Sequence, residues 1–197
     1  MSLIEGFLLG LGSILFIGPV FFVILKNTLE YGKLAGFYIS IGILFSDFVY
    51  MVLYKYFLYD SIEKYLDTTY TYSLFALILF VMGVANILKK SKENSKVHLF
   101  RNNPITMFSK GFLINFVNPF VFLFWLGVFK YSSEKFDNFN QLLFLGSSLV
   151  GIFIIDMVKV LFSAVLKKYL NSDTLLLLYK IIGFIFISFS LYIVFLR

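Results

Sequence analysis

The sequence predicts an all-α integral membrane protein with six transmembrane helices arranged as two inverted three-helix repeats. Three observations predict this fold class: a very apolar composition, six long apolar blocks, and a pattern that recurs in both halves of the chain. Of the 197 residues, 60% are hydrophobic and 14% are charged, and the mean hydropathy is +0.90. A soluble domain of this length has too little interior to bury so much apolar surface.

Six continuously apolar blocks follow one another along the chain, each about as long as the 17 to 25 residues that cross a bilayer core as a helix. Barrel strands would alternate apolar and polar residues, which these blocks do not do. The first block opens with Met-Ser-Leu-Ile-Glu, without Lys or Arg, and is too long for a signal peptide, so we expect a mature transmembrane helix. The predicted helices cover residues 3–25, 34–57, 72–88, 111–129, 142–166 and 175–196.

Basic residues concentrate between the third and fourth blocks. Residues 89–110 contain six of the 17 Lys and Arg residues, and the positive-inside rule assigns such a segment to the cytoplasm. We expect the protein in the plasma membrane, which is the bacterial inner membrane. Because the chain crosses it six times, both termini are then expected on the outer side. We expect one domain over residues 1–197, with repeat one at about 1–88, a basic cytoplasmic loop at about 89–110 and repeat two at about 111–197.

The two halves of the chain share short motifs at corresponding places. Residues 42–47 and 151–156 both read Gly-Ile-x-x-x-Asp. Gly18-Pro19 interrupts the first block and Asn118-Pro119 interrupts the fourth. Because each half has an odd number of helices, the two copies face opposite ways across the membrane, as in the inverted repeats of many secondary transporters.

The two prolines predict broken helices. Proline removes a backbone N–H and displaces the carbonyl four residues earlier, which for Pro119 is that of Asn115. In hydrocarbon, such irregular backbone is tolerated only against protein or a water-filled cavity. A plain kink is the alternative for either proline alone. Two breaks in corresponding helices indicate a functional site. Asn115 and Asn118, three residues apart, lie on one helix face there. The expected broken-helix elements are Gly18, Pro19, Pro119, Gly42 and Gly151.

Asp47 and Asp156 fall near the centres of their predicted helices, where an aspartate costs roughly 2.5 to 3.5 kcal/mol. Asp47 belongs to a polar stripe that includes Ser40, and no Lys or Arg lies within a turn of it. It therefore needs a proton, a substrate cation or a group on another helix. Asp156 and Lys159 form an i,i+3 pair that is either part of a site or only an intrahelical ion pair.

Residues 108–119, which read Phe-Ser-Lys-Gly-Phe-Leu-Ile-Asn-Phe-Val-Asn-Pro, contain the pattern Gly-x-x-x-Asn-x-x-Asn-Pro. Together with Gly18-Pro19, Gly42 and Asp47, this stretch resembles the LysE-type translocators, amino-acid exporters related to the lysine and homoserine/threonine export proteins. The resemblance covers essentially the whole chain. Ile17 and Phe120 stand where the family usually has proline and often has lysine.

The resemblance implies secondary export of amino acids or similar small metabolites across the plasma membrane, by proton coupling or by exchange. The substrate-binding or coupling residues expected from the pattern are Asp47, Asp156, Asn115, Asn118, Lys159 and Ser40. A carboxyl in a low-dielectric site can exchange protons near neutral pH, which favours a proton as the coupling ion. The expected partners are a small-molecule substrate and the lipid bilayer, with no nucleic acid and no cofactor; a homo-oligomer is compatible with the sequence.

Three other functions compete with amino-acid export as interpretations of the sequence. A divalent-cation exporter of a related fold needs clustered ligands, yet the one histidine, His98, lies in the basic segment, so no metal site is expected. An enzyme is not expected, because an intramembrane hydrolase needs a base such as His inside the apolar blocks. A non-transporting assembly subunit would leave Asp47 and the two breaks without a purpose.

Overall fold

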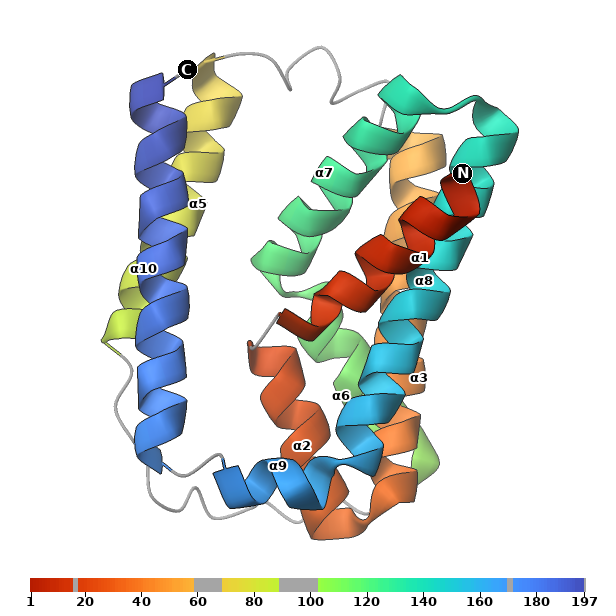
Figure 1. The fold of residues 1–197 in the computed structure, drawn as a ribbon, viewed down its shortest axis with the longest axis vertical. Coiled ribbons are helices and arrows are strands. Elements are labelled where there is room, and N and C mark those ends of the chain that lie inside the picture. The colour runs from red at the N-terminus through yellow and green to blue at the C-terminus, as the bar shows by residue number, and fades with distance from the viewer. Residues whose placement is uncertain (16–17, 59–68, 89–102, 170–171, 197) are drawn as a thin grey trace. The chain divides into compact units, whose positions relative to one another are not determined.

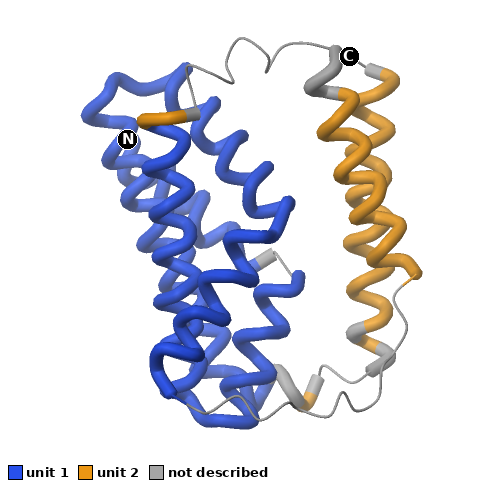
Figure 2. Tube along the Cα trace, turned by 180° about the vertical axis from the view of Figure 1, so that it is seen from behind, with its two compact units in different colours: residues 1–55, 98–167 blue, residues 56–97, 168–197 orange. Residues whose placement is uncertain are grey.

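A computed structural model of the chain describes residues 1–15, 18–58, 69–88, 103–169 and 172–196. All regular elements in these ranges are helical. The chain divides into two compact units, each described separately below (Figure 2). Unit 1 contains Met1–Lys55 and His98–Lys167, and unit 2 contains Tyr56–Val97 and Lys168–Arg197.

Unit 1 is a bundle built from both halves of the sequence (Figure 1). Within it, α1 packs along α8, and α6 packs along α3. Unit 2 is an antiparallel pair in which α5 packs along α10. The helices of unit 1 are α1 (Ser2–Gly12), η1 (Ser13–Leu15), α2 (Pro19–Tyr31), α3 (Lys33–Leu53), α6 (Pro104–Phe116), α7 (Pro119–Lys135) and α8 (Asn138–Leu161), and most of α9 (Ser163–Tyr169) belongs to it as well. Unit 2 holds α5 (Thr69–Ile87) and α10 (Ser172–Leu196), and the π-helical segment η2 (Tyr54–Leu58) continues α3 across the boundary.

Local sequence explains where several helices of unit 1 begin. The Asn103 side chain accepts a hydrogen bond from the N–H of Thr106 and caps α6, and Asp137 caps α8 by accepting from the N–H of Asn140. These hydrogen bonds from Asn140 hold the pKa of the Asp137 carboxyl below its usual value. At the turn between α2 and α3, Gly32 adopts a φ of 88°, a conformation that glycine takes without strain.

Both predicted helix breaks are present, and each lies at the expected proline. The pair α6 and α7 is bent by 68° across residues 117–118, and Pro119 is the first residue of α7, where its missing N–H costs nothing. Pro19 likewise starts α2, after α1 and η1 have ended at Leu15. Each proline therefore starts a new helix and does not kink a continuous one.

By length and hydropathy, three described helices are long enough to cross a membrane, or four if the bent pair α6–α7 is one span. They are Lys33–Phe57, Asn138–Leu161 and Leu176–Phe195. The other two expected blocks contain shorter apolar helices, Ser2–Gly12 and Ser73–Ile87. The first block contains two separate helical stretches, one that ends at Leu15 and one that starts at Pro19.

Gly42 and Gly151, expected among the broken-helix elements, lie inside the continuous helices α3 and α8. Their function there is close packing. A side chain at Gly42 would overlap the carbonyl oxygen of Phe108 in α6, and one at Gly151 would meet the backbone of Phe7 and Gly10 in α1. The absence of a side chain lets each helix pair approach backbone to backbone.

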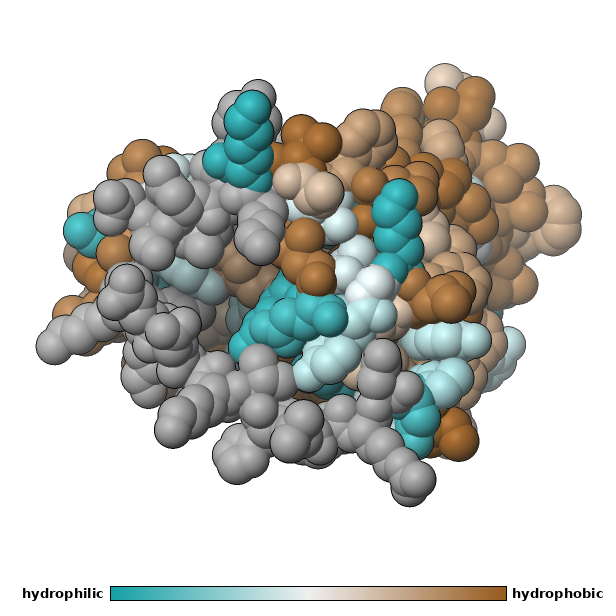
Figure 3. All heavy atoms as spheres, turned by 90° about the horizontal axis from the view of Figure 1, so that it is seen from below, coloured by the Kyte–Doolittle hydropathy of each residue, from teal (hydrophilic) through white to brown (hydrophobic). Residues whose placement is uncertain are grey.

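Corresponding glycines line three helix contacts: Gly42 with Gly111 between α3 and α6, Gly151 with Gly10 between α8 and α1, and Gly83 with Gly183 between α5 and α10. Outside these contacts the surface is largely apolar, with exposed Leu, Ile, Val and Phe side chains on most helices. Hydrophilic residues gather at the end of the molecule seen from below in Figure 3, with hydrophobic residues beside them. This distribution suits a bundle whose sides face lipid.

Changing Gly42 to alanine is expected to force α3 and α6 apart, because the new methyl group overlaps backbone rather than a movable side chain. We expect a loss of about 1–3 kcal/mol in the free energy of unfolding, measured by thermal denaturation in detergent. The matched control is Gly127→Ala in α7, where a methyl group would meet nothing within 4 Å. Equal stability of the two variants would contradict the close packing described here.

Candidate functional site

The candidate site surrounds the carboxyl of Asp47, in the middle of α3. This side chain is 3% exposed, inside unit 1. The amide of Asn115 and the indole N–H of Trp125 both donate to its Oδ1, each at 2.8 Å. Asn115 belongs to α6 and Trp125 to α7, so a single oxygen of α3 binds both halves of the broken helix.

The second carboxyl oxygen of Asp47 has a different environment. Oδ2 accepts no hydrogen bond from the part of the chain that the structure describes, since both donors bind Oδ1. Oδ2 is not among the fully enclosed side-chain oxygens without a partner, which in the described ranges are those of Ser13 and Ser40, so it stays open to a further group. Oδ2 is therefore the position at which a proton or a cationic group would be stabilised most.

The Asn115 amide is held by more than Asp47. Its Nδ2 also lies 3.2 Å from the hydroxyl oxygen of Ser46 and 3.4 Å from the carbonyl oxygen of Ile43, both in α3. Asn118, the other expected asparagine, is buried beside the break, and its side chain caps α7 by accepting from the N–H of Phe120 at 3.1 Å. Of the two asparagines, Asn115 contacts the carboxyl and Asn118 shapes the helix start.

Tyr50 of α3 and Tyr54, the first residue of η2, satisfy the backbone of the broken helix. The Tyr50 hydroxyl donates to the carbonyl oxygen of Phe116, the last residue of α6, and the Tyr54 hydroxyl donates to that of Phe122 at 2.9 Å. The carbonyl of Asn115, which we expected the proline to leave free, accepts from the N–H of Asn118 at 3.2 Å. Side chains of α3 and η2 thus take the place that water would have at an exposed break.

Asp156 and Lys159 form the predicted pair within α8. The Lys159 ammonium lies 2.9 Å from Asp156 Oδ1, and both side chains are buried. Since α8 packs against α3, this ion pair and Asp47 lie on contacting helices of the same unit. The remaining predicted residue, Ser40, is fully buried in α3, and its hydroxyl oxygen has no hydrogen-bond partner within the described ranges.

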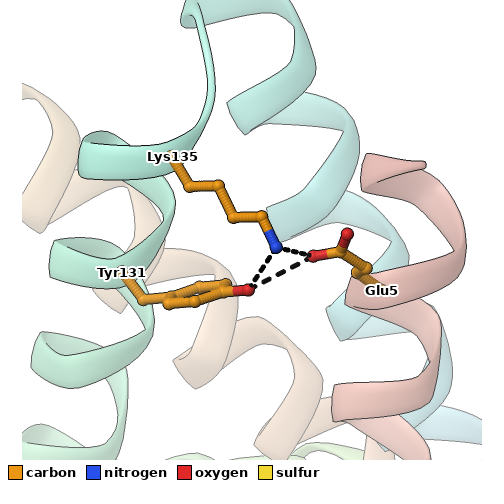
Figure 4. A network of polar contacts seen from close by, with 3 residues as sticks. All are labelled: Glu5, Tyr131 and Lys135. Carbon is orange, nitrogen blue, oxygen red and sulfur yellow. Dashed lines mark hydrogen bonds and ion pairs between the residues drawn. The ribbon is translucent and has the colours of Figure 1, made fainter.

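Polar contacts also join the helices nearer their ends. Figure 4 shows Glu5 of α1 receiving hydrogen bonds from Lys135 and Tyr131 of α7, at 2.7 and 3.2 Å. Toward the opposite ends of the bundle's helices, the Lys110 ammonium in α6 donates to Asn27 of α2 at 2.7 Å. The first contact joins α1 to α7 and the second joins α2 to α6, so each connects a half of the broken helix α1–α2 to a half of the broken helix α6–α7.

A third polar cluster joins η2, α7 and α8. Gln141, which is buried, accepts from the Lys55 ammonium at 2.9 Å and donates to the hydroxyl of Ser132 at 3.3 Å. Among the residues with described positions, no three His, Cys, Asp or Glu side chains gather closely enough to hold a metal ion together. His98, the chain's one histidine, lies outside the described ranges.

Sequence reasoning missed Trp125 and did not assign Tyr50 and Tyr54 to the break. Trp125 carries a signal of its own: it is the chain's one tryptophan and falls within an apolar block, whereas membrane tryptophans favour the interfaces. The two tyrosines occupy the same helix face as Asp47, at spacings of three and seven residues. An aromatic donor on the stripe of a buried aspartate can bind a carbonyl near a helix break.

Removing the Tyr50 hydroxyl is expected to destabilise the protein, because the carbonyl of Phe116 at the end of α6 then has no donor. We expect Tyr50→Phe to lose about 1–3 kcal/mol in the free energy of unfolding. Tyr54→Phe is the matched control with a smaller loss, since Phe122 lies within α7 and its carbonyl keeps its helical partner. Thermal denaturation of both variants in detergent measures the difference, and a greater loss for Tyr54→Phe would contradict it.

Comparison with known proteins agrees with this architecture. The sequence profile of the family described as "LysE type translocator" matches residues 11–196. The chain is 28% identical over 194 residues to "Putative amino acid efflux protein YcgF" of Bacillus subtilis (strain 168), covering 93% of this chain and 90% of that protein. No solved structure matches. LysE type translocators are membrane transporters and not enzymes, and the match over nearly the whole length means that this chain belongs to the LysE type translocator family.

Proposed function

We propose that this protein is a secondary transporter that exports amino acids or similar small metabolites across the plasma membrane, by proton coupling or exchange. The observation that carries the proposal is the buried carboxyl of Asp47, which has one oxygen bound to both halves of a broken helix and the other without a donor. The oxygen without a donor is available to a proton or to a cationic group. The name of the Bacillus subtilis relative, an amino acid efflux protein, supports the same substrate class.

In this proposal Asp47 receives the substrate ammonium or the coupling proton at Oδ2. Asn115 orients the carboxyl, and Asn118 with Pro119 forms the start of α7, whose positive dipole end favours a carboxylate. Gly18 and Pro19 form the equivalent start of α2, which has no side-chain cap. The buried residues Ser40, Asp156 and Lys159 complete the expected set on α3 and α8.

The helix contacts support the inverted-repeat plan of this transporter. The first half-helix of one half of the chain, α1, packs on α8 of the other half, and α6 packs on α3 in the same way. Corresponding glycines line both contacts. We propose that residues 1–88 and 111–197 are two copies that face opposite ways within one transport domain, with residues 89–110 cytoplasmic and both termini outside.

Asp47→Asn is expected to abolish export, because an amide at this position binds neither a proton nor an ammonium as a carboxylate does. The measurement is efflux of preloaded labelled amino acids from proteoliposomes, with and without an imposed pH gradient. Asp137→Asn is the matched control, since Asp137 is an exposed helix cap and asparagine caps helices equally well.

Full export by the Asp47→Asn protein would contradict this site. If the parent chain moves no amino acid under any gradient, the proposed substrate class is wrong. A second panel of solutes, made up of divalent cations, then tests the cation-exporter alternative directly.

The buried ion pair of α8 is expected to contribute to export as well as to stability. Asp156→Asn alone leaves the Lys159 ammonium buried without its partner and is expected to cost about 3–5 kcal/mol. The double variant Asp156→Asn with Lys159→Met removes both charges and should recover most of that stability. We expect this folded double variant to export several times more slowly than the parent chain, whereas export at the parent rate would assign the pair to structure alone.

A further inference from the structure

The two donors to Asp47 Oδ1 come from opposite sides of the break between α6 and α7. Asn115 lies in the last turn of α6, and Trp125 lies in α7, six residues after Pro119. Both bonds measure 2.8 Å, and all three side chains are almost fully buried. The carboxyl therefore fixes each half of the broken helix to α3 separately.

The two halves differ in how else they are held. α6 packs closely along α3, where Gly42 and Gly111 let the backbones touch, whereas α7 has much sparser contacts with α3 and α8. Asn115 is held additionally by Ser46 and the Ile43 carbonyl. Among the described side chains of α7, Trp125 is the one that reaches the Asp47 carboxyl, and its indole has a single N–H to donate.

We propose that Trp125 is a positioning residue that couples the loading of Asp47 to the position of α7. This inference rests on the proposed function, in which Oδ2 receives the ammonium or the coupling proton. An ionised carboxylate accepts hydrogen bonds about twice as strong as a neutral one does. A proton or ammonium at Oδ2 withdraws charge from Oδ1 and weakens both of its hydrogen bonds.

The weakening has unequal consequences for the two half-helices. α6 stays on α3 through its backbone packing, while α7 loses the one contact that ties it to the carboxyl. The bend of 68° between the halves, where Pro119 contributes no backbone N–H to link them, is the point about which α7 turns. Loading of the site is thereby linked to opening of the bundle on the side of α7.

The sequence allows a test that changes only the N–H of this indole. Trp125 is the chain's one tryptophan, so a tryptophan-auxotrophic host can replace it alone. The isostere β-(3-benzothienyl)alanine keeps the ring system and lacks the N–H. The matched control is 5-fluorotryptophan, which keeps the N–H and is incorporated in the same way.

Movement of α7 is followed by a spin label. The chain has no cysteine, so Gly127→Cys introduces a single label site on α7, at a position with open space beside it. Gly146→Cys on α8, also beside open space, is the reference. The probe is the proton, applied as a step from alkaline to acidic pH, and the same step on an Asp47→Asn chain isolates the contribution of Asp47.

The comparison with the Asp47→Asn chain is needed because the helices packed against α3 carry other ionisable groups. They are Asp156 and Lys159 on α8, Lys110 on α6, Lys26, Glu30 and Tyr31 on α2, and Lys130, Tyr131, Glu134 and Lys135 on α7. The Asp47→Asn chain retains all of them. A pH response that they cause therefore persists in that chain and is subtracted.

With tryptophan or 5-fluorotryptophan, we expect the α7 label to change mobility on acidification while the α8 label does not. With the benzothienyl residue, the α7 label should be mobile at both pH values. The maximal export rate should fall about tenfold while the half-saturation concentration stays unchanged, because Oδ2 is intact. Two results would overturn the proposal. One is an α7 label whose mobility still changes on acidification in the benzothienyl protein, and the other is an α7 label whose mobility does not change in a parent protein that exports.

A measurement on the unmodified chain covers the case in which the benzothienyl protein does not fold. Ultraviolet resonance Raman spectra of Trp125 report the strength of its N–H hydrogen bond, which should weaken on acidification in the parent protein; an unchanged hydrogen bond contradicts the coupling. Failure of the proposed function has a different outcome: the parent chain then exports neither the amino acids nor the divalent cations. A parent that exports with an unresponsive Trp125 keeps the function and removes this inference.

Discussion

The hydrogen bonds that one carboxyl oxygen of Asp47 accepts from α6 and α7 hold the two halves of a broken helix against α3. Broken backbone is stable inside a bilayer only when protein groups replace water. Here α3 supplies them, with Asp47 binding the side chains of both halves and Tyr50 binding the last carbonyl of α6. The site and the break are consequently one structure, and a change in the charge of Asp47 changes the attachment of both half-helices.

Packing decides which parts of this structure are rigid. Glycines bring the backbones of α3 and α6 into direct contact, and those of α1 and α8 likewise, so each long helix is bound to one short half-helix. The second half-helices differ from each other. α2 packs on α3 through an apolar core that includes Ile24 and Ile39, whereas α7 has sparser contacts with α3 and α8. A bundle in which α6 is tightly bound and α7 is bound through fewer contacts is compatible with the proposed movement of α7.

Much of this arrangement was predictable from the sequence. Composition gave the membrane class, both prolines marked real helix starts, and a buried aspartate without a local cation had to find partners on another helix. The identity of those partners was not predictable, because the contact of Trp125 with Asp47 spans 78 residues and depends on the 68° bend. Gly42 and Gly151 were assigned to breaks because glycine has two uses in helices, flexibility and close approach, which only the neighbouring helix distinguishes.

The central claim is that Asp47 changes its bonding when the transporter is loaded, and infrared difference spectroscopy tests it most directly. The purified protein in lipid is exposed to the exported amino acid, and the change in the aspartate carboxyl bands is recorded for the parent and for Asp47→Asn. The account predicts a substrate-induced carboxyl signal in the parent that is missing from the variant. An identical carboxyl signal in both proteins would contradict it, because the responding group would then be another carboxylate, with Asp156 on α8 the first to examine.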